Sequence, residues 1–379
     1  MHDAVRGVPP SDGVEPGTPG YPEKMSETQP LTVVVTGATG NVGTSVIEAL
    51  GSRPEVTSIR AIARRPTGLR YPKTEFLVAD TGQDDLRPLF RGADVVVHLA
   101  WIFQPTHDPV STWENNVGGA IRVFEAAAAE DVPAVVYSSS VAAYSPGPKD
   151  TPVDESWPTN GWPGAAYPRE KAYLERWLDG FEHNNPEMRV VRMRPGFIFK
   201  REASTAQRRL FVGPFLPRQL VRSALIPVVP RTPGLSFQAL HSADVGEAFA
   251  EATVRPVRGA FNLATDEKVD AKYLAKMLGA RSIPAPASLL RAGVWAAWHA
   301  HVIPASPGLF DTVLRIPLMD ITRARRELGW SPRYTAKDAL EEFIEGVREG
   351  SGMDTEPLAP DGPARRIAEL SQGVGRRDR

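Results

Sequence analysis

The segment from Val33 to Gly43, V-V-V-T-G-A-T-G-N-V-G, constrains the fold of this chain more than any other stretch. An apolar run suited to a buried strand passes directly into glycines with the spacing G-x-x-G-x-x-G, and helix-forming residues follow from Ser45. Gly37 can adopt backbone angles closed to other residues, Gly40 lets the main chain approach a pyrophosphate, and Gly43 lets helix and strand pack closely. The helix N-terminus would then direct its free N–H groups at the phosphates. The pattern predicts the start of a dinucleotide-binding fold, with an ordinary strand-to-helix turn as the alternative.

The composition excludes several classes of protein. A hydrophobic fraction of 42% and a charged fraction of 23% are those of an ordinary globular protein. The formal net charge of -1 gives no reason to expect nucleic acid or an anionic membrane as a partner. Cysteine is absent, which excludes disulfides and thiolate sites and fits a cytoplasmic location. No stretch carries ligands spaced for a metal ion, so no metal is predicted.

Three segments need an interpretation outside the main fold. Residues 1–30 are rich in Pro and Gly and lack a continuous apolar core, so we expect a disordered extension rather than a targeting signal. Residues 349–379 are expected to form a flexible tail, with a short surface helix over Ala364–Leu370. Leu289–Ile303 is apolar but too short to span a bilayer, and it contains Arg291. A helix that covers an apolar pocket is favoured there over attachment to a membrane surface, and no stable membrane insertion is expected.

Strands and helices alternate through the first half of the chain, which predicts an α/β fold with a doubly wound parallel sheet. Ser58–Ala63 is expected to be the second strand, and Arg64 and Arg65 follow it. In dinucleotide folds an acid near this position accepts hydrogen bonds from the adenosine ribose, whereas two arginines suit the extra phosphate of NADP. NADP is therefore the predicted cofactor. NAD and a solvated basic turn are the alternatives.

Further strands are predicted to end at the same edge of the sheet. Glu75–Asp80 is the expected third strand, which places Asp80 where it can meet the adenine amino group. A helix is predicted over residues 84–90, and Ala93–Ala100 forms a fourth strand that is almost continuously apolar. Within that strand, His98 is interpreted as a packed side chain rather than a catalytic base.

The loop that leaves the fourth strand is rich in aromatic residues. Trp101, Phe103 and Trp113 either pack locally beneath the loop or line a substrate pocket. A long helix is predicted from Asn115 to Ala129, and Ala134–Ser140 is the expected fifth strand, which ends in three hydroxyl side chains.

The segment Y-P-R-E-K places the Tyr167 phenol and the Lys171 ammonium one helical turn apart on the same face. Pro168 fits the first turn of a helix, where no backbone hydrogen bond is lost. Hydride transfer to a carbonyl requires a proton donor near the oxygen, and a lysine cation lowers the pKa of a nearby tyrosine. A serine hydroxyl from the fifth strand would hold the substrate oxygen.

Together these pieces resemble the extended short-chain dehydrogenase/reductase superfamily, which includes NAD-dependent epimerases and dehydratases. The resemblance spans about residues 31–348. Its motifs, in order along the chain, are T-G-A-T-G-N-V-G (36–43), H-L-A (98–100), Asn116, Y-S-S-S-V-A-A-Y (137–144), Y-P-R-E-K (167–171), R-P-G-F-I-F (194–199), H-S-A-D-V (241–245), G-A-F-N-L (259–263) and D-I-T-R-A-R-R-E-L-G-W-S-P (320–332).

The resemblance implies a role for each matching residue. Ser140 would be the catalytic serine, Tyr167 the acid/base, Lys171 the ribose-binding helper and Asn116 part of their supporting network. The residues implied to line the pyrophosphate are Gly37, Gly40, Asn41, Val42 and Gly43. Those implied near the nicotinamide half are Leu99, Ala100, Ser138, Pro195, Gly196 and Phe197. His241 and Asp244 resemble a structural turn before a helix over Val245–Ala252, without a catalytic or metal role.

The resemblance also implies a domain organisation. A Rossmann domain would occupy residues 31–195, and a smaller substrate-binding region, interleaved with the last Rossmann elements, would occupy residues 196–348. A homodimer through the helices near 116–130 and 167–181 is the assembly that the superfamily often forms.

The departures from the superfamily pattern bear on the substrate. Phe197 and Phe237 stand where sugar-nucleotide enzymes usually carry an asparagine and an arginine, and an anionic substrate needs paired charges. Lys200 replaces the usual glycine after R-P-G-F-I-F, which changes the loop that follows. The sequence therefore predicts an NAD(P)-dependent oxidoreductase acting on a carbonyl or secondary alcohol of a largely apolar small molecule. A sugar-nucleotide epimerase or dehydratase, and a dinucleotide-sensing protein without turnover, are the alternatives.

Overall fold

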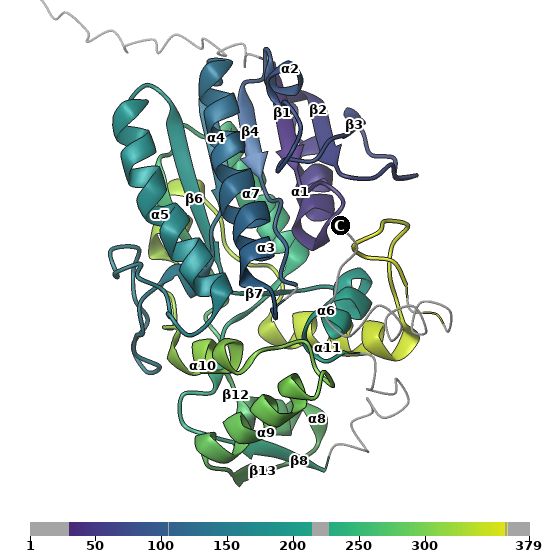
Figure 1. The fold of residues 1–379 in the computed structure, drawn as a ribbon, viewed down its shortest axis with the longest axis vertical. Helices are drawn as coiled ribbons and strands as arrows, with labels where there is room; N and C mark the ends of the chain where they lie inside the picture. Colours follow the sequence, from purple (N-terminus) through teal and green to yellow (C-terminus); the bar gives the residue numbers. More distant parts are fainter. Residues whose placement is uncertain (1–29, 105, 214–226, 361, 363–379) are drawn as a thin grey trace, which may run out of the picture.

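The computed structural model describes residues 30–104, 106–213, 227–360 and 362. Its centre is a seven-stranded parallel sheet with the strand order β11-β6-β5-β4-β1-β2-β3 (Figure 1). The strands are β1 (Leu31–Thr36), β2 (Val56–Ala63), β3 (Thr74–Val78), β4 (Val95–His98), β5 (Ala134–Ser138), β6 (Arg189–Pro195) and β11 (Gly259–Leu263). Because both faces of such a sheet are covered, β4 and most of β5 are buried along their length, as their apolar runs predicted.

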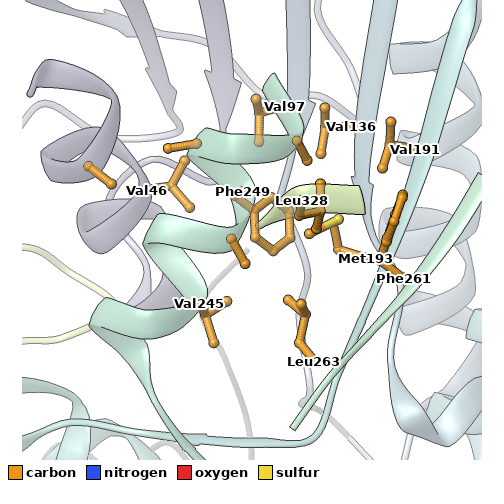
Figure 2. Close-up of a cluster of buried hydrophobic side chains, with 14 of the residues drawn as sticks. Val46, Val97, Val136, Val191, Met193, Val245, Phe249, Phe261, Leu263 and Leu328 are labelled. Carbon is orange, nitrogen blue, oxygen red and sulfur yellow. The ribbon is translucent and has the colours of Figure 1, made fainter. Parts of the chain in front are cut away.

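Helices cover the sheet in two layers. Helices α1 (Asn41–Gly51) and α7 (Ser242–Val254) pack on one face, where Phe249 lies over strand residues such as Val97 and Val136 (Figure 2). Helices α2 (Arg87–Phe90), α4 (Gly119–Ala129) and α5 (Ala166–Asn184) cover the other face, as Figure 1 shows for α4 and α5. The predicted Rossmann-type fold is therefore confirmed.

Several element boundaries differ from the sequence prediction. The helix expected over 84–90 is reduced to the single turn α2, and β5 ends at Ser138 because Ser140 caps the 3-10 helix η2 (Val141–Ala143). The long helix begins earlier than predicted, with α3 (Pro109–Trp113), and passes through the π-helical turn η1 (Glu114–Gly118) into α4. Asp108 caps α3 and Pro109 occupies its first turn, which are favourable start signals for a helix.

The second half of the chain builds a smaller region below the sheet (Figure 1). It contains three two-stranded pairs, β7 (Phe197–Phe199) with β10 (Ala239–His241), β9 (Ser236–Phe237) with β12 (Val269–Asp270), and β8 (Val228–Arg231) with β13 (Arg281–Pro284). Its helical elements are η3 (Arg201–Ala203), α6 (Ser204–Phe211), α8 (Ala271–Leu278), α9 (Ala287–His299), α10 (Pro307–Arg315) and α11 (Ala336–Glu349). The π-helical turn η6 (Ala324–Leu328) instead packs against α7 and β11 of the main sheet.

Helix α9 (Ala287–His299) covers most of the apolar stretch 289–303, but none of its residues is fully buried. Trp298 contacts the loop after β4, where its indole donates to Thr106 Oγ1 at 2.9 Å and its ring stacks on His107. Among residues 30–104, 106–213 and 227–360, no helix has the length and apolar character needed to cross a membrane. The predicted helix over 364–370 and the N-terminal extension through Gln29 lie outside the described residues.

Candidate active site

A groove opens at the carboxyl edge of the sheet, where the strand order reverses. The chain leaves β1 toward β2 and β3 on one side and returns to β4 on the other, which is where ligands bind in open α/β sheets. The groove has a volume of about 720 Å³, counted to its open mouth. Its lining includes predicted cofactor residues from four different segments, namely Gly37, Gly40, Arg64, Asp80, Leu99 and Ala100, together with Asn116.

The glycine turn has the geometry that a close approach requires. Gly37 has a φ of +69°, and a Cβ added there would lie 2.6 Å from the backbone nitrogen of Ala100. A Cβ on Gly43 would meet the Gly37 carbonyl oxygen at 2.2 Å, so this glycine allows α1 to pack against the turn. Gly40 lines the groove, and the backbone of the turn can therefore reach a ligand there. These observations fit a pyrophosphate.

The side of the groove nearest β2 and β3 carries the charged residues that the sequence predicted. Arg64 and Asp80 both line it, and Arg64 is exposed. Asp80 Oδ1 accepts a hydrogen bond of 2.8 Å from the Gly82 backbone, which holds the carboxylate in its turn. Arg65 lies beside the groove, where its guanidinium is 3.3 Å from Glu356. The acid that would accept ribose hydroxyls is absent from the end of β2, where Ala63 stands.

Tyr167 lies in a second, smaller pocket that adjoins the groove. This pocket has a volume of about 340 Å³ and shares Ile102 with the groove. Its lining is largely apolar, and no Lys or Arg of the described residues contributes to it: Ile102, Phe103, Thr106, Thr112, Ala165, Ala166, Tyr167, Glu170, Ser306 and Leu309. The ring of Phe103 packs 4.5 Å from that of Tyr167, so one aromatic side chain of the loop does line the predicted substrate pocket.

The Tyr167 phenol interacts with Ser140 and is held protonated. Burial raises the pKa of Tyr167 to about 12, the hydrogen bond with the Ser140 side chain opposes this rise, and the charge of Glu170 adds to it. Lys171 makes no contribution to this shift, so the predicted lowering of the Tyr167 pKa by Lys171 does not occur. The phenol is therefore a proton donor at neutral pH rather than a tyrosinate.

Lys171 is turned away from the groove. Its ammonium donates to the Ser138 carbonyl at 2.6 Å and lies 3.4 Å from the centre of the Trp101 ring. Burial lowers the pKa of Lys171 well below its usual value, although Glu170 and Glu175 oppose this shift. Trp101 lines the groove, and its buried indole nitrogen has no hydrogen-bond partner within the described protein. The Trp101 ring, part of the groove wall, therefore lies against the Lys171 ammonium.

Glu170 is a site residue that the sequence analysis missed. Its carboxylate accepts hydrogen bonds from Thr112 Oγ1 at 2.6 Å and from Asn116 Nδ2 at 2.7 Å. Asn116 in turn brackets Ile102, accepting from its backbone nitrogen at 2.8 Å and donating to its carbonyl at 2.9 Å. The network thus holds the residue that separates the two cavities. The sequence signal that could have identified Glu170 was a charged residue next to Lys171 on the inward face of the same helix.

The remaining predicted residues lie at the rim or behind the groove. Asn41 reaches across to Ile198, donating to its carbonyl at 3.4 Å, and Val42 packs against the core. Ser138 contributes the carbonyl that holds Lys171. Pro195 ends β6, the Gly196 nitrogen donates to the Leu263 carbonyl, and Phe197 packs on Phe237 with ring centres 4.8 Å apart. None of these residues belongs to the groove lining.

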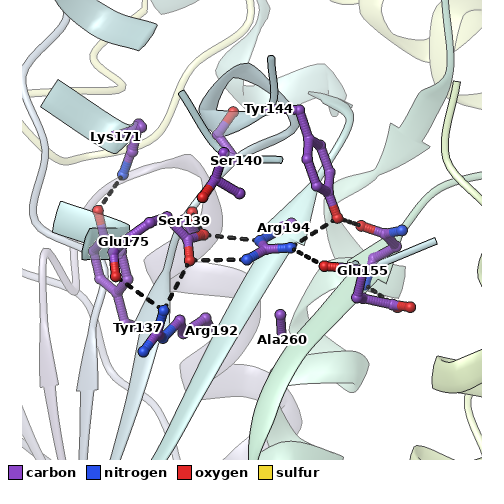
Figure 3. A network of polar contacts seen from close by, with 12 residues as sticks. Tyr137, Ser139, Ser140, Tyr144, Glu155, Lys171, Glu175, Arg192, Arg194 and Ala260 are labelled. Carbon is purple, nitrogen blue, oxygen red and sulfur yellow. Dashed lines mark hydrogen bonds and ion pairs between the residues drawn. The ribbon is translucent and has the colours of Figure 1, made fainter. Parts of the chain in front are cut away.

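A buried ionic network lies beneath the predicted catalytic residues (Figure 3). Glu175 of α5 accepts a bidentate pair from Arg194, with distances of 2.8 and 2.9 Å, and a hydrogen bond of 2.5 Å from Ser139. Arg192 also contacts Glu175, at 3.3 Å. Since Ser139 and Ser140 are adjacent, this network fixes the end of β5 and hence the position of Ser140.

His98 and His241 could have been interpreted as functional residues, but both make structural contacts. His98 is buried, and its Nδ1 lies 2.7 Å from Thr36 Oγ1. His241 caps α7, accepting from the Ala243 nitrogen, while Asp244 accepts from two backbone nitrogens of the segment before α11. No cluster of three or more His, Cys, Asp and Glu suited to a metal ion occurs in the described part of the chain.

Comparison with known proteins identifies the family. Residues 33–259, more than half of the chain, match the model of the NAD dependent epimerase/dehydratase family. The chain belongs to this family. The predicted superfamily resemblance is therefore confirmed, and the protein is an enzyme of the NAD-dependent epimerase/dehydratase family.

The proteins that are similar to this chain differ in the functions that their names describe. An uncharacterized protein of Mycobacterium tuberculosis (strain H37Rv) is 26% identical over 331 residues, which cover 84% of each chain. The L-arabinose 1-dehydrogenase (NAD(P)(+)) of Haloferax volcanii is 39% identical over 109 residues, 28% of this chain and 40% of the relative. Among solved structures, a UDP-glucose 4-epimerase from Thermus thermophilus in complex with NAD has 22% identity and a TM-score of 0.61, covering 84% of this chain and 99% of that chain.

Proposed function

We propose that this protein is an NADP-preferring oxidoreductase that transfers hydride at a carbonyl or secondary alcohol of a largely apolar small molecule. The observation that carries the proposal is the position of Tyr167. Its phenol lies beside Ser140 in an apolar pocket that shares Ile102 with the groove of the glycine turn. The proposed proton donor therefore lies in a pocket next to the groove that would hold a dinucleotide.

The groove residues fit a nicotinamide dinucleotide. The turn at Gly37 and Gly40 would hold the pyrophosphate, Arg64 the 2′-phosphate of NADP, and Asp80 the adenine. The unpartnered indole nitrogen of Trp101 offers a further donor to a ligand. When bound, the dinucleotide supplies the hydride donor or acceptor. The solved Thermus thermophilus relative is described with NAD, which is the alternative cofactor for this chain.

The chain's own residues would handle the proton and the substrate oxygen. Tyr167 is protonated at neutral pH, so it would donate its proton to the oxygen of a carbonyl and accept it back from an alcohol. Ser140 would hold that oxygen and orient it toward the phenol. Lys171, once released from beneath Trp101, would hydrogen-bond the ribose and favour loss of the phenol proton through its charge.

The pocket lining supports an apolar substrate. Ile102, Phe103 and Leu309 are apolar residues of its wall, and Thr106, Thr112 and Ser306 offer hydroxyls that could orient one polar group. No cation of the described residues lines it, whereas a diphosphate requires paired charges. Phe197 and Phe237 pack on each other in place of two polar side chains that sugar-nucleotide enzymes carry.

A sugar-nucleotide epimerase is the second candidate. It is supported by the family to which the chain belongs and by relatives of similar fold solved with UDP-sugars, such as the UDP-glucose 4-epimerase from Thermotoga maritima. An epimerase returns its cofactor to the starting redox state, so it produces no net reduced dinucleotide. Binding of UDP-glucose tight enough to raise the melting temperature, with epimerised product and no net redox change, would favour this candidate.

The test compares Tyr167→Phe with Tyr173→Phe, a half-exposed tyrosine on the same helix. Net oxidation of NADPH is followed across a panel of apolar ketones and aldehydes. We expect Tyr167→Phe to lower kcat by about 10²–10⁴-fold, since general acid catalysis contributes this much, and Tyr173→Phe to leave it unchanged. Equal activity of the two variants would refute the assignment of Tyr167.

The cofactor preference is tested separately. Arg64→Gln is expected to weaken NADP binding about tenfold while NAD binding stays within about twofold, because only NADP carries the phosphate that the guanidinium would pair with. Calorimetric titration with each dinucleotide measures the change. A wild-type protein that binds NAD more tightly than NADP would refute this part of the proposal.

A further inference from the structure

The segment that follows α11 turns back over the cofactor groove. Helix α11 ends at Glu349 and is capped by Gly350, which has a φ of +72°. The chain then rises beside α6 toward α1, as the yellow trace in Figure 1 shows. We call Met353–Ala359 the C-terminal strap. Its own backbone closes a compact loop, in which the Met353 nitrogen donates to the Leu358 carbonyl at 2.8 Å. The sequence assigned these residues to a flexible tail, but in the structure they make specific contacts.

The C-terminal strap is anchored from below. Leu358 is only 2% exposed and packs with Ala203 and Ala206, next to the start of α6. Arg209 of α6 donates to the Ala359 carbonyl at 2.9 Å and to the Pro357 carbonyl at 3.2 Å. A buried apolar side chain and a guanidinium that holds two carbonyls give the strap a defined position.

The upper side of the C-terminal strap contacts the glycine turn itself. The Thr355 hydroxyl is buried and donates to the Thr39 carbonyl at 3.1 Å. Pro357 is one of the residues that line the groove, as Arg64 and Asp80 are. The strap therefore contributes a residue to the wall of the groove.

The C-terminal strap also brings a carboxylate to the second arginine after β2. Glu356 Oε1 lies 3.3 Å from the Arg65 guanidinium, and the two side chains are each 48% exposed. An arginine already paired with a carboxylate is less available to a phosphate, and the carboxylate itself repels a phosphate dianion. A ribose with a free 2′-hydroxyl carries no such charge, and a nearby carboxylate can accept its hydrogen bond.

We propose that the C-terminal strap forms the outer wall of the dinucleotide site and that Glu356 is a specificity-determining residue that limits the preference for a 2′-phosphorylated cofactor. This inference rests on the proposed binding of a nicotinamide dinucleotide in the groove. Arg64 attracts the 2′-phosphate, and the pairing of Glu356 with Arg65 sets how strong that attraction becomes. Cofactor selectivity is thus decided jointly by the turn after β2 and by a segment about 290 residues away in the chain.

The first experiment measures the dissociation constants of NADP and NAD by calorimetry for the wild type and Glu356→Gln. The matched control is Glu341→Gln, which breaks the pair with Lys337 on α11 and is 49% exposed. We expect Glu356→Gln to bind NADP about three- to tenfold more tightly and NAD within about twofold, because exposed charge pairs are worth factors of this size. Glu341→Gln should match the wild type. An unchanged NADP-to-NAD ratio in Glu356→Gln refutes the selectivity role.

The second experiment tests the wall. Thr355→Val removes the hydrogen bond to the Thr39 carbonyl and the bond of 3.3 Å that the hydroxyl accepts from the Leu358 nitrogen, but it keeps the shape of the side chain. We expect the dissociation rates of both dinucleotides, measured by stopped-flow fluorescence, to rise at least threefold. Equal dissociation rates in the variant and the wild type would refute the proposal that the C-terminal strap forms the outer wall of the site. Failure of the wild-type protein to bind either dinucleotide would instead refute the proposed function, so the two failures are distinguishable.

Discussion

Gly37 provides a quantitative test of how the glycine turn is built. The residue combines a φ of +69° with a contact that leaves no room for a side chain, since an added Cβ would lie 2.6 Å from Ala100 N and 2.8 Å from Ala100 Cα. Gly92 has nearly the same φ, +66°, but nothing lies within 4 Å of the position of its Cβ. Comparing alanine substitutions at Gly37 and Gly92 therefore distinguishes the cost of backbone strain from the cost of the close contact between the segments that follow β1 and β4.

The expected magnitudes follow from these two effects. Gly92→Ala should lower the free energy of unfolding by about 1–2 kcal/mol, the cost of a left-handed conformation for a residue with a Cβ. Gly37→Ala should lower it by about 2–5 kcal/mol, because displacing packed backbone adds about 1–3 kcal/mol. It should also weaken dinucleotide binding, since Ala100 lines the groove.

The assay is urea unfolding followed by tryptophan fluorescence and far-ultraviolet circular dichroism, with the free energy extrapolated to zero denaturant. Dinucleotide titration of both variants provides the functional readout. If Gly37→Ala loses no more stability than Gly92→Ala, the close contact with Ala100 does not constrain the turn, and the physical reason given for this glycine is wrong.

Three further outcomes test other parts of the structure. Burial lowers the pKa of His98 to about 3, so the folded state disfavours its protonation. On the order of 5 kcal/mol of stability should therefore be lost as pH falls from about 6.5 to about 3. Urea unfolding across this range should show a smaller loss of stability with falling pH for His98→Gln than for the wild type. Glu175→Ala leaves the Arg194 guanidinium buried without its carboxylate and should cost about 3–5 kcal/mol in the same assay. Ser140→Ala should lower kcat about 10²-fold while dinucleotide affinity is retained, because the hydroxyl is proposed to position the substrate oxygen beside Tyr167. Steady-state kinetics and calorimetric titration measure the two quantities, and a loss of affinity without a loss of turnover would contradict this role.

Local patterns were sufficient to predict the fold. The apolar runs of β1, β4 and β5 identify strands covered on both faces, and the three glycines mark the turn between β1 and α1. The spacing of Tyr167 and Lys171 likewise identifies a helix face, since residues four apart lie one turn from each other. Such signals lie within a few residues, so they are visible without the tertiary structure.

Boundaries were harder to predict where the tertiary structure overrides local preference. Residues 84–90 have a helical composition, but only Arg87–Phe90 form a turn. Ser139 and Ser140 continue the composition of β5, but Ser139 donates to Glu175 and Ser140 caps the next helix. The partners that end these elements lie on other segments, so no local pattern announces them.

Local sequence patterns were enough to predict the strand, turn and helix of the proposed cofactor site and the order of the residues proposed to act in it. Which of these groups contact one another depends on the tertiary structure. It directs Lys171 beneath Trp101, buries Glu170 against Asn116, and lays Glu356 beside Arg65. The physical reason is that a periodic pattern reports which face of an element is buried, whereas these contacts join segments that only the closed fold brings together.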